Sequence, residues 1–396
     1  MASRLAIDGG KPVRSTLLPY GRQSVDEEDI RVVVEVLKSD WLTTGPKVHE
    51  FEGGFANFVG SKYAVAVSSG TAALHAAVFA AGIGPGDEVI VPPMTFAATA
   101  NVVVYQGGNP VFADVDPDTL LLDPNKAEAK ITPRTKAIIA VDYAGQPCDY
   151  DSLRGIATRH NLILIADACH ALGATYKKRK VGTLADLNVF SFHPVKHITT
   201  GEGGMITTDN PKFAERMKIF RNHGITADHQ QRKEQGSWFY EMVDLGYNYR
   251  LTDIQCALGL TQLKKLDAWV AKRHEIAAHY ATAFKSRPEV EPLAVLPDRY
   301  PVWHLYVIRL KLERLRVGRK EIFAALRAEN IGANVHYIPV YWHPYYHRLG
   351  YASRLCPVAE EAYERLITLP LFSSMADQDV QDVITAVSKV TKAYSL

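Results

Sequence analysis

Cysteine is scarce in this sequence of 396 residues, which contains four: Cys148, Cys169, Cys256 and Cys356. They lie far apart, and none belongs to a C-x-x-C pair. This spacing predicts neither a disulfide framework nor a structural zinc site.

An excess of charge of one sign is also missing. Lys and Arg number 45 and Asp and Glu 43, which gives a net charge of +2. A chain so balanced has no broad electrostatic surface for nucleic acid or anionic lipid. We therefore expect neither of these as a partner.

Long hydrophobic runs are absent as well. The longest apolar stretch, 89–105, is interrupted by Pro92, Pro93 and Asn101 and is too short to span a bilayer. The first residues, MASRLAIDGGKP, lack the apolar core of a secretory signal. We expect a cytoplasmic protein without membrane segments.

The composition is that of an ordinary globular protein, with 47% hydrophobic and 22% charged residues. The length favours two domains. Short apolar strands alternate with helical patterns through the first half of the chain. The predicted strands are 63–69, 86–93, 110–115, 136–145 and 161–168, and the predicted helices are 25–38, 70–82, 95–108 and 149–160. Strands that are apolar on both faces indicate a mostly parallel sheet covered by helices on both sides, an α/β architecture.

Two further strands, 187–192 and 204–209, follow one another without a helix and predict a meander. The pattern then changes after Arg250. One long helix is predicted over 251–284, followed by a strand at 302–310, a helix at 319–329, a strand at 331–338 and a last helix around 380–390. We place a boundary near residue 260, which predicts a large α/β domain with an N-terminal arm (1–260) and a smaller C-terminal α+β domain (261–396).

A possible anion site lies in VSSGTAALH (67–75), where a strand runs into a helix. Free amides at the helix start, with Gly70 and Thr71, suit a phosphate. The alternative is plain N-capping by Ser69, which needs no ligand.

An acid, Asp167, ends the apolar strand NLILIADA, at the edge where open α/β sheets bind ligands. A capping acid or a buried ion pair is the alternative.

Lys196 lies between an apolar strand and a glycine-rich turn in VFSFHPVKHITTGEGG (189–204). Most lysines are solvated surface charges, but apolar neighbours lower a lysine pKa and make it a candidate Schiff-base nucleophile. Ser191, five residues earlier, could donate to a phosphate. Asn248 and Arg250 precede the long helix, and capping that helix is their simplest role.

These features are more specific together than separately. A phosphate loop, an acid after a strand and a strand-flanked lysine are what pyridoxal phosphate requires for its phosphate, its pyridine nitrogen and its aldehyde.

The sequence resembles the DegT/StrS-type sugar aminotransferases of the fold-type-I pyridoxal-phosphate class. The resemblance runs over nearly the whole chain, in WLTTGPKVHEFE, SSGTAALH, TFAATAN, ADACHALGA, SFHPVKHITTGEGG, GYNYRLTDIQCALG and NVHYIP. Within this family, PYGRQSVDEEDI (19–30) and AGQPCD (144–149) most resemble the enzymes that aminate C4 of a UDP-linked 4-keto-6-deoxy-HexNAc in pseudaminic acid biosynthesis.

The resemblance implies a role for each matching residue. Lys196 would form the Schiff base with pyridoxal 5'-phosphate and then move a proton, and Asp167 would bind the pyridine nitrogen. His170 would lie near the phenolic oxygen of the cofactor, and Phe96 would stack on its ring. The phosphate would be held by Gly70, Thr71 and Ser191, together with Asn248 from the partner subunit of a homodimer.

The implied substrates are L-glutamate and the nucleotide-linked keto sugar, with sugar or diphosphate contacts expected at Lys47, His197, Arg250, His336 and Tyr337. Other nucleotide-linked keto sugars, dTDP- or GDP-linked and aminated at C3 or C4, stay open. Some relatives carry histidine in place of the lysine and are sugar dehydratases; here the lysine is present and the histidine is its neighbour, His197. A non-enzymatic sensor and a metal hydrolase using Asp167, Cys169 and His170 are weaker alternatives, the latter because adjacent strand residues point to opposite faces.

Overall fold

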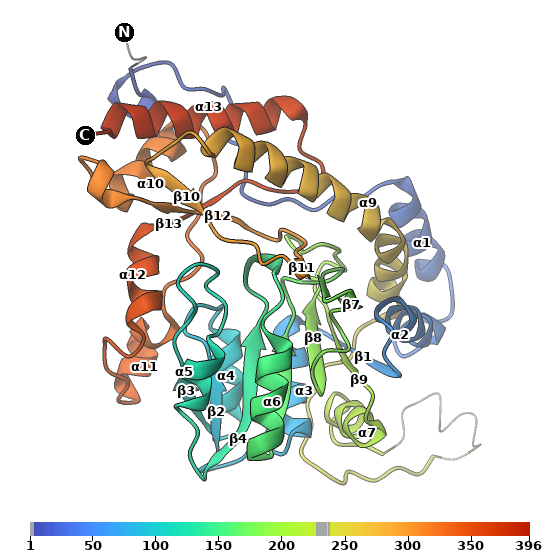
Figure 1. Ribbon diagram of the computed structural model, residues 1–396. Coiled ribbons are helices and arrows are strands. Elements are labelled where there is room, and N and C mark those ends of the chain that lie inside the picture. Colours follow the sequence, from blue (N-terminus) through green and yellow to red (C-terminus); the bar gives the residue numbers. More distant parts are fainter. Residues whose placement is uncertain (1–3, 227–235, 237) are drawn as a thin grey trace.

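A seven-stranded sheet forms the centre of the molecule. The computed structural model describes residues 4–226, 236 and 238–396 (Figure 1). The strand order is β1-β9-β8-β5-β4-β2-β3. Along the chain the strands are β1 (Tyr63–Val67), β2 (Glu88–Val91), β3 (Asn109–Phe112), β4 (Thr135–Val141), β5 (Ile163–Asp167), β8 (Leu187–Ser191) and β9 (Gly204–Thr208).

All of these strands are parallel except β9, which pairs antiparallel with both β8 and β1. The predicted mostly parallel sheet and the predicted β8–β9 meander are therefore confirmed. The order places the carboxyl ends of β5 and β8 next to each other, with Asp167 paired to Val189.

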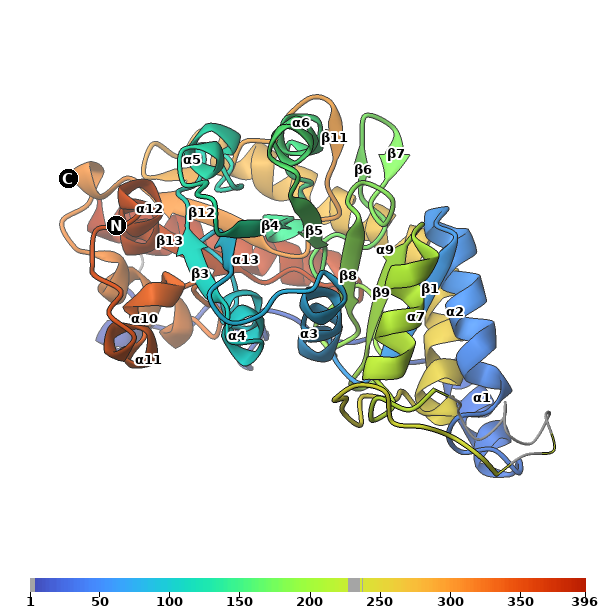
Figure 2. The same cartoon turned by 90° about the horizontal axis from the view of Figure 1, so that it is seen from below.

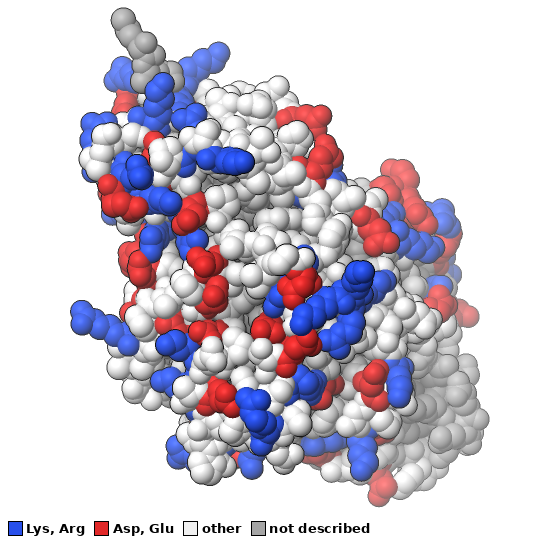
Figure 3. Space-filling view, in the orientation of Figure 1, with Lys and Arg blue, Asp and Glu red and all other residues white. Residues whose placement is uncertain are grey.

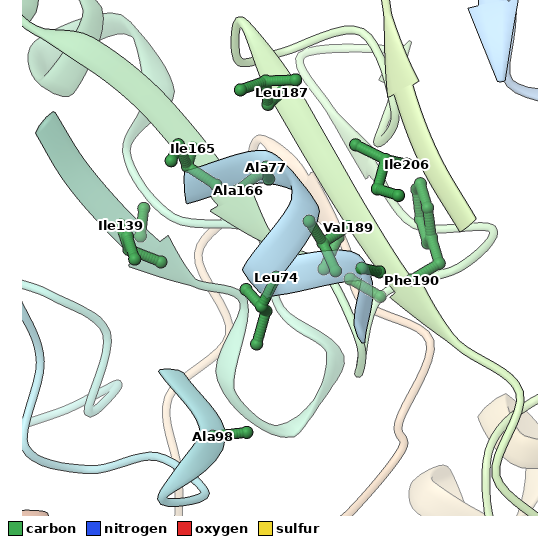
Figure 4. Close-up of a cluster of buried hydrophobic side chains, with 14 of the residues drawn as sticks. Leu74, Ala77, Ala98, Ile139, Ile165, Ala166, Leu187, Val189, Phe190 and Ile206 are labelled. Atoms are coloured by element: carbon green, nitrogen blue, oxygen red, sulfur yellow. The ribbon is translucent and has the colours of Figure 1, made fainter. Parts of the chain in front are cut away.

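Helices cover both faces of the sheet (Figure 2). On one face lie α5 (Pro124–Glu128) and α6 (Tyr150–His160), and on the other α3 (Gly70–Ala80), α4 (Ala98–Tyr105) and α7 (Pro211–Phe220). Helix α3 crosses the strands with small side chains, and Leu74 and Ala77 pack toward Ile165, Val189 and Phe190 (Figure 4). The alanine content of α3 thus lets the helix lie close to the sheet, which brings its first turn to the strand ends.

Three helices pack beside β1: α1 (Glu27–Leu37), α2 (Pro46–Val59) and the long α9 (Asp253–Phe284). The buried Asp29 joins α1 to α9, because its carboxylate accepts hydrogen bonds from Thr261 Oγ1 at 2.5 Å and Gln262 Nε2 at 2.7 Å. A capping box between Thr252 and Gln255 begins α9. The predicted long helix is confirmed.

A second, smaller layer lies above the sheet in Figure 1. It consists of an antiparallel sheet of β10 (Val290–Pro292), β12 (Tyr306–Leu310) and β13 (Leu366–Leu369), with α10 (Arg319–Ala328) and α13 (Asp377–Tyr394). Its hydrophobic cluster includes the last turns of α9 and, from the N-terminal arm, Leu5 and Leu18. The arm therefore packs on this layer, and the division at residue 260 stays a prediction.

The predicted strand 331–338 is wrong. This segment makes isolated bridges only, at Ile331 and Asn334, and the third strand of the small sheet is β13. The reason is that β13 pairs with β12 along its length and occupies that edge. Residues 331–338 therefore lie outside the sheet, and His336 and Tyr337 line the cavity next to the large layer. The strand predicted at 302–310 is shorter than expected and begins at Tyr306.

The remaining elements are short. Helices α11 (Pro344–Arg348) and α12 (Pro357–Arg365) lie beside β3, and Phe112 packs on Tyr341 and Tyr346. A third sheet joins β11 (Arg299–Tyr300) to the hairpin of β6 (Thr175–Tyr176) and β7 (Arg179–Lys180). The 3-10 helices are η1 (Ala6–Asp8), η2 (Tyr143–Gly145), η3 (Leu312–Arg314) and η4 (Val340–Trp342).

The face seen in Figure 3 carries basic and acidic side chains interspersed, as the even charge balance suggests. Within the described part of the chain, no helix has the length and apolar character needed to cross a membrane.

Candidate active site

A cavity of about 600 Å³ opens where the carboxyl ends of the strands meet the smaller layer. Nine of the residues singled out from the sequence line it: Gly70, Thr71, Phe96, Asp167, His170, Ser191, Lys196, His336 and Tyr337. They come from both layers and are up to 267 positions apart (337 − 70), so the fold assembles one site from separate motifs.

Asp167 ends β5 and is 6% exposed. Thr99 Oγ1 donates to its Oδ2 at 2.7 Å, and the backbone amide of Cys169 donates to Oδ1 at 3.3 Å. Thr95 is hydrogen-bonded to Thr99 in turn, at 2.7 Å. These hydrogen bonds fix the orientation of the carboxylate. None of its hydrogen-bond partners among the described residues is a cationic side chain, so the carboxylate can pair with a protonated heterocycle.

The first turn of α3 forms a cradle with the end of β8. Ser69 caps the helix by accepting from Ala72 N at 3.0 Å. This cap still leaves the amides of Gly70 and Thr71 without an intrahelical acceptor, so it does not exclude a phosphate there. A Cβ on Gly70 would lie 2.7 Å from Ser191 Cβ, and therefore only glycine fits there. Amides and a hydroxyl converging at a helix start fit a phosphate group.

Lys196 lies in the loop between β8 and β9, and its side chain is partly buried in the cavity. Its Nζ is 3.4 Å from Nε2 of His304. Burial lowers the pKa of Lys196, and nearby Cys169 and Asp167 oppose the shift. A lowered pKa increases the fraction of neutral amine, the form that attacks an aldehyde.

Aromatic rings form the remaining wall. His170 Nε2 is 3.1 Å from the hydroxyl of Tyr337, and Phe96, 63% exposed, lies at the mouth with its ring centroid 6.3 Å from that of Tyr337. His336 is fixed through Nδ1 to Thr368 Oγ1 at 2.9 Å. Burial lowers the pKa of His336 to about 4, so its ring is neutral at neutral pH.

Four candidates lie outside the lining of this cavity. Lys47 forms an exposed ion pair with Glu50 at 2.6 Å. His197 is 4% exposed, and its Nε2 is 3.1 Å from the carbonyl oxygen of Val302, so this placement gives no support to a sugar contact.

The other two candidates outside the lining are Asn248 and Arg250, which both contact Asn222. Arg250 Nη1 donates to Asn222 Oδ1 at 2.8 Å, and Asn248 forms a backbone bridge with the same residue. Arg250 lines a separate pocket between α2 and α7. The roles of both residues stay predictions. For Asn248, the expected contact is with the phosphate in the site of a partner subunit.

Tyr20, Thr99 and His304 also line the cavity and were not predicted from the sequence as site residues. Thr99 lies within the quoted TFAATAN segment, and its position one turn after Thr95 was the available signal. Tyr20 lies within the quoted PYGRQSVDEEDI segment and reaches the site from the N-terminal arm. His304 carries no local signal, because it reaches the site from the segment before β12.

A second buried carboxyl, Asp142, lies behind Asp167 at the end of β4. It is fully buried, its amide donates to the carbonyl of Asp167 at 3.1 Å, and its Oδ1 accepts from Cys148 N and Tyr150 Oη at 2.9 and 2.8 Å. Burial raises the pKa of Asp142 from 3.8 to about 7, against those two hydrogen bonds.

We expect Asp142→Asn to change how stability depends on pH. Between pH 3.8 and about 7 the folded state keeps a proton that the unfolded chain has lost. The native protein therefore loses stability as the pH rises through this window, and the loss is complete above about 7. Asparagine keeps the accepting oxygen without the charge, so the variant should gain up to about 3 kcal/mol relative to the native protein between pH 5 and pH 8. Urea unfolding midpoints at several pH values measure this, and parallel pH curves for the two proteins would contradict it.

Among the residues that the structure describes, no group of three or more His, Cys, Asp or Glu side chains is arranged to hold a metal ion.

Comparison with known proteins identifies the family. The model of the DegT/DnrJ/EryC1/StrS aminotransferase family matches residues 23–388. The spore coat polysaccharide biosynthesis protein SpsC of Bacillus subtilis (strain 168) is 47% identical over 382 residues, which is 96% of this chain and 98% of SpsC.

Two solved structures share the fold. Helicobacter pylori PseC, an aminotransferase involved in the biosynthesis of pseudoaminic acid, superposes with a TM-score of 0.89 at 35% identity, covering 96% of this chain and 100% of PseC. The PLP form of the putative sugar aminotransferase Spr1654 from Streptococcus pneumoniae gives 0.89 at 34% identity, over 95% and 99%. The chain therefore belongs to the DegT/DnrJ/EryC1/StrS aminotransferase family, and it is a pyridoxal-phosphate-dependent sugar aminotransferase of fold type I.

Proposed function

We propose that this enzyme transfers the amino group of L-glutamate to the C4 keto carbon of a UDP-linked 4-keto-6-deoxy-HexNAc. The observation that carries the proposal is a single cavity in which Lys196, Asp167 and the first turn of α3 converge. The choice of C4 and of a UDP-linked HexNAc is supported by the likeness to PseC over nearly the full length of both chains.

The residues present fit pyridoxal phosphate. The amides of Gly70 and Thr71 and the hydroxyl of Ser191 would bind its phosphate, in the cradle that excludes any Cβ at position 70. Asp167, held by Thr99, would bind the pyridine nitrogen. When bound, the cofactor would supply an electron sink and a carbonyl carbon that carries the amino group from the donor to the keto sugar.

Lys196 has two functions in this proposal. It would hold the cofactor covalently through Nζ at rest, and its free amine would then remove and return protons at the donor and sugar carbons. Its partly buried position keeps Nζ from full solvation, and the lowered pKa leaves more of the amine able to accept a proton at neutral pH.

The mouth of the cavity would receive the sugar. Phe96, Tyr337, His336 and Tyr20 surround it, and the His336 and Tyr20 rings lie 5.3 Å apart. Neutral imidazole and phenol groups can donate hydrogen bonds to sugar hydroxyls without pairing to a fixed charge. The placement of Tyr337 supports it as a sugar contact. Both ring nitrogens of His336 already have partners, Thr368 Oγ1 at 2.9 Å and Asn334 Nδ2 at 3.4 Å, so a sugar contact through His336 stays a prediction.

A second copy of the chain would complete the site. The segment before Asn248 exposes large apolar side chains, among them Trp238 (85% exposed), Met242 (68%) and Leu245 (72%). Such a cluster favours burial against another protein surface. Asn248, which does not line the cavity of its own chain, would then reach the phosphate site of the partner.

Mass-detected turnover of 4-keto-6-deoxy UDP- and dTDP-sugars with L-glutamate tests the proposal. The expected result is one amino group added at C4 of the UDP-HexNAc ketone, with one 2-oxoglutarate formed per amino sugar. Refusal of every UDP-HexNAc ketone together with amination of a dTDP sugar would overturn the substrate. A deoxy sugar without nitrogen would instead indicate dehydration.

A second candidate substrate is a different nucleotide-linked keto sugar destined for a surface polysaccharide. The observation that favours it is the 47% identity to SpsC, a spore coat polysaccharide biosynthesis protein, compared with 35% to PseC. The same panel of sugars separates the two candidates, because it reports which ketone is converted.

A further inference from the structure

The segment that joins β11 to β12 crosses the floor of the cavity and carries His304. Its backbone is hydrogen-bonded to η2, from Val302 N to the carbonyl of Gly145 at 3.0 Å and from Leu305 N to that of Ala144 at 3.4 Å. Gly145 has φ +98°, and a Cβ there would lie 2.9 Å from both His304 N and the carbonyl oxygen of His170. This close approach of three chain segments fixes His304 in place.

The His304 side chain is buried, with 5% of its surface exposed. Its Nε2 lies 3.4 Å from Lys196 Nζ, its ring centroid is 4.2 Å from that of His170, and the ring of His197 lies behind it at 5.6 Å. Nδ1 is buried without a hydrogen-bond partner among the described residues. Of the two ring nitrogens, Nε2 therefore lies within hydrogen-bond distance of a partner, and that partner is the Nζ of Lys196.

The ring is neutral. Burial lowers the pKa of His304 well below its usual range, and the positive charge of Lys196 adds to the effect. A neutral imidazole has one protonated and one unprotonated nitrogen, so with the proton on Nδ1 the Nε2 lone pair can accept from an ammonium or amine N–H.

We propose that His304 is a positioning residue for Lys196, accepting a hydrogen bond from Nζ whenever the lysine is not bound to the cofactor. This proposal rests on the function given above, in which Lys196 is released in the first half-reaction and must wait near the substrate carbon. In the described part of the chain, His304 is the side chain that lies within hydrogen-bond distance of Nζ, so without it the free amine is not held at this point. Because the hydrogen bond exists only with the lysine free, it stabilises that form of the enzyme selectively.

The consequence is an equilibrium that can be measured. Glutamate and 2-oxoglutarate are added in known ratios to the holoenzyme, without sugar. Their ratio sets the equilibrium between two forms of the enzyme, one with Lys196 bound to the cofactor and one with Lys196 free and the cofactor carrying the amino group. Absorbance measures the proportion of the two forms. We expect His304→Phe, which keeps the ring volume and removes the acceptor, to shift this balance toward the lysine-bound form by about 10-fold or more. The rate constant of the half-reaction should fall by about 10- to 100-fold, with the half-saturating glutamate concentration changed less than about twofold.

Two further variants make the test specific. His304→Gln can place an amide oxygen near the position of Nε2, and it should recover most of the shift. His274→Phe is the matched control, since His274 is a partly buried histidine that stacks on Tyr300 and does not line the cavity, and it should leave the balance as in the native enzyme. Melting temperatures of all variants show whether they fold.

Each outcome decides something. An unchanged balance in folded His304→Phe, or equal shifts in the Phe and Gln variants, would overturn the role of His304 and leave the proposed function intact. A native holoenzyme whose absorbance responds to no amino-acid donor would overturn the proposed function, and the positioning role with it.

Discussion

Replacing Lys196 with alanine is expected to lower the rate of both half-reactions by about 10⁴-fold or more, because in the proposed function the same amine binds the cofactor and carries the protons. The cradle of Gly70, Thr71 and Ser191 and the carboxylate of Asp167 stay in place in this variant. The cofactor should therefore still bind, but without a covalent bond. Stopped-flow absorbance with glutamate alone, and then with the keto sugar alone, measures the two half-reactions separately.

Two controls accompany this variant. Lys212→Ala removes an exposed lysine in the first turn of α7 and should keep native rates. If two chains share each site as proposed above, mixing Lys196→Ala chains with Asn248→Ala chains should restore up to about a quarter of the native activity, since half of the random dimers would contain one site with both residues intact. Transamination by Lys196→Ala alone, near the native rate, would refute the assignment of this lysine.

Replacing Asp167 with asparagine is expected to lower turnover by about 10²- to 10³-fold. The asparagine amide can occupy nearly the same space and still accept from Thr99, so the change is mainly the loss of a negative charge. Without this charge the pyridine nitrogen of the bound cofactor is not held in its protonated form, and the cofactor becomes a weaker electron sink. Rates of the two half-reactions and the dissociation constant of the cofactor measure the effect.

Variants of neighbouring groups separate charge from orientation at Asp167. Thr99→Val removes the 2.7 Å hydrogen bond to Oδ2 while keeping the charge, and we expect a loss of about 10-fold. Asp209→Asn, at an exposed acid that accepts from the amide of Lys62, is the matched control without effect on turnover. If Thr99→Val were as damaging as Asp167→Asn, orientation and not charge would be the main contribution of the carboxylate.

The sequence predicted best those strands that are buried on both faces of the sheet. β4 and β5 are apolar at nearly every position because helices cover both faces, and the short apolar runs between helical patterns reveal this directly. Helix α9 was equally clear from its length. β13 was missed because it is four residues long and follows α12 without a loop, so its apolar residues continue the preceding helical pattern.

Neither Lys196 nor Asp167 is specific by itself, although each lies beside an apolar strand where burial of a charge is costly. Together with the anion cradle they match what pyridoxal phosphate requires. Local order also specifies the anion cradle, since a strand, a glycine and a helix start follow one another directly at residues 67–71. In these cases neighbouring residues carry the signal. The sequence by itself therefore determined the cofactor class, and it is the basis for proposing Lys196 as the reacting lysine.

Only the tertiary structure brought His304 to Lys196, Thr99 to Asp167 and Tyr20 to His336. The partners in these pairs are 108, 68 and 316 positions apart, and no local pattern relates them. Each contact depends on how segments pack: the approach of residues 302–305 to Gly145, the packing of α4 against α3 and β3, and the arm that adds Leu18 to the small layer. Local apolar patterning determined the sheet and its reactive groups, whereas close packing between distant segments decided which side chains hold those groups in position.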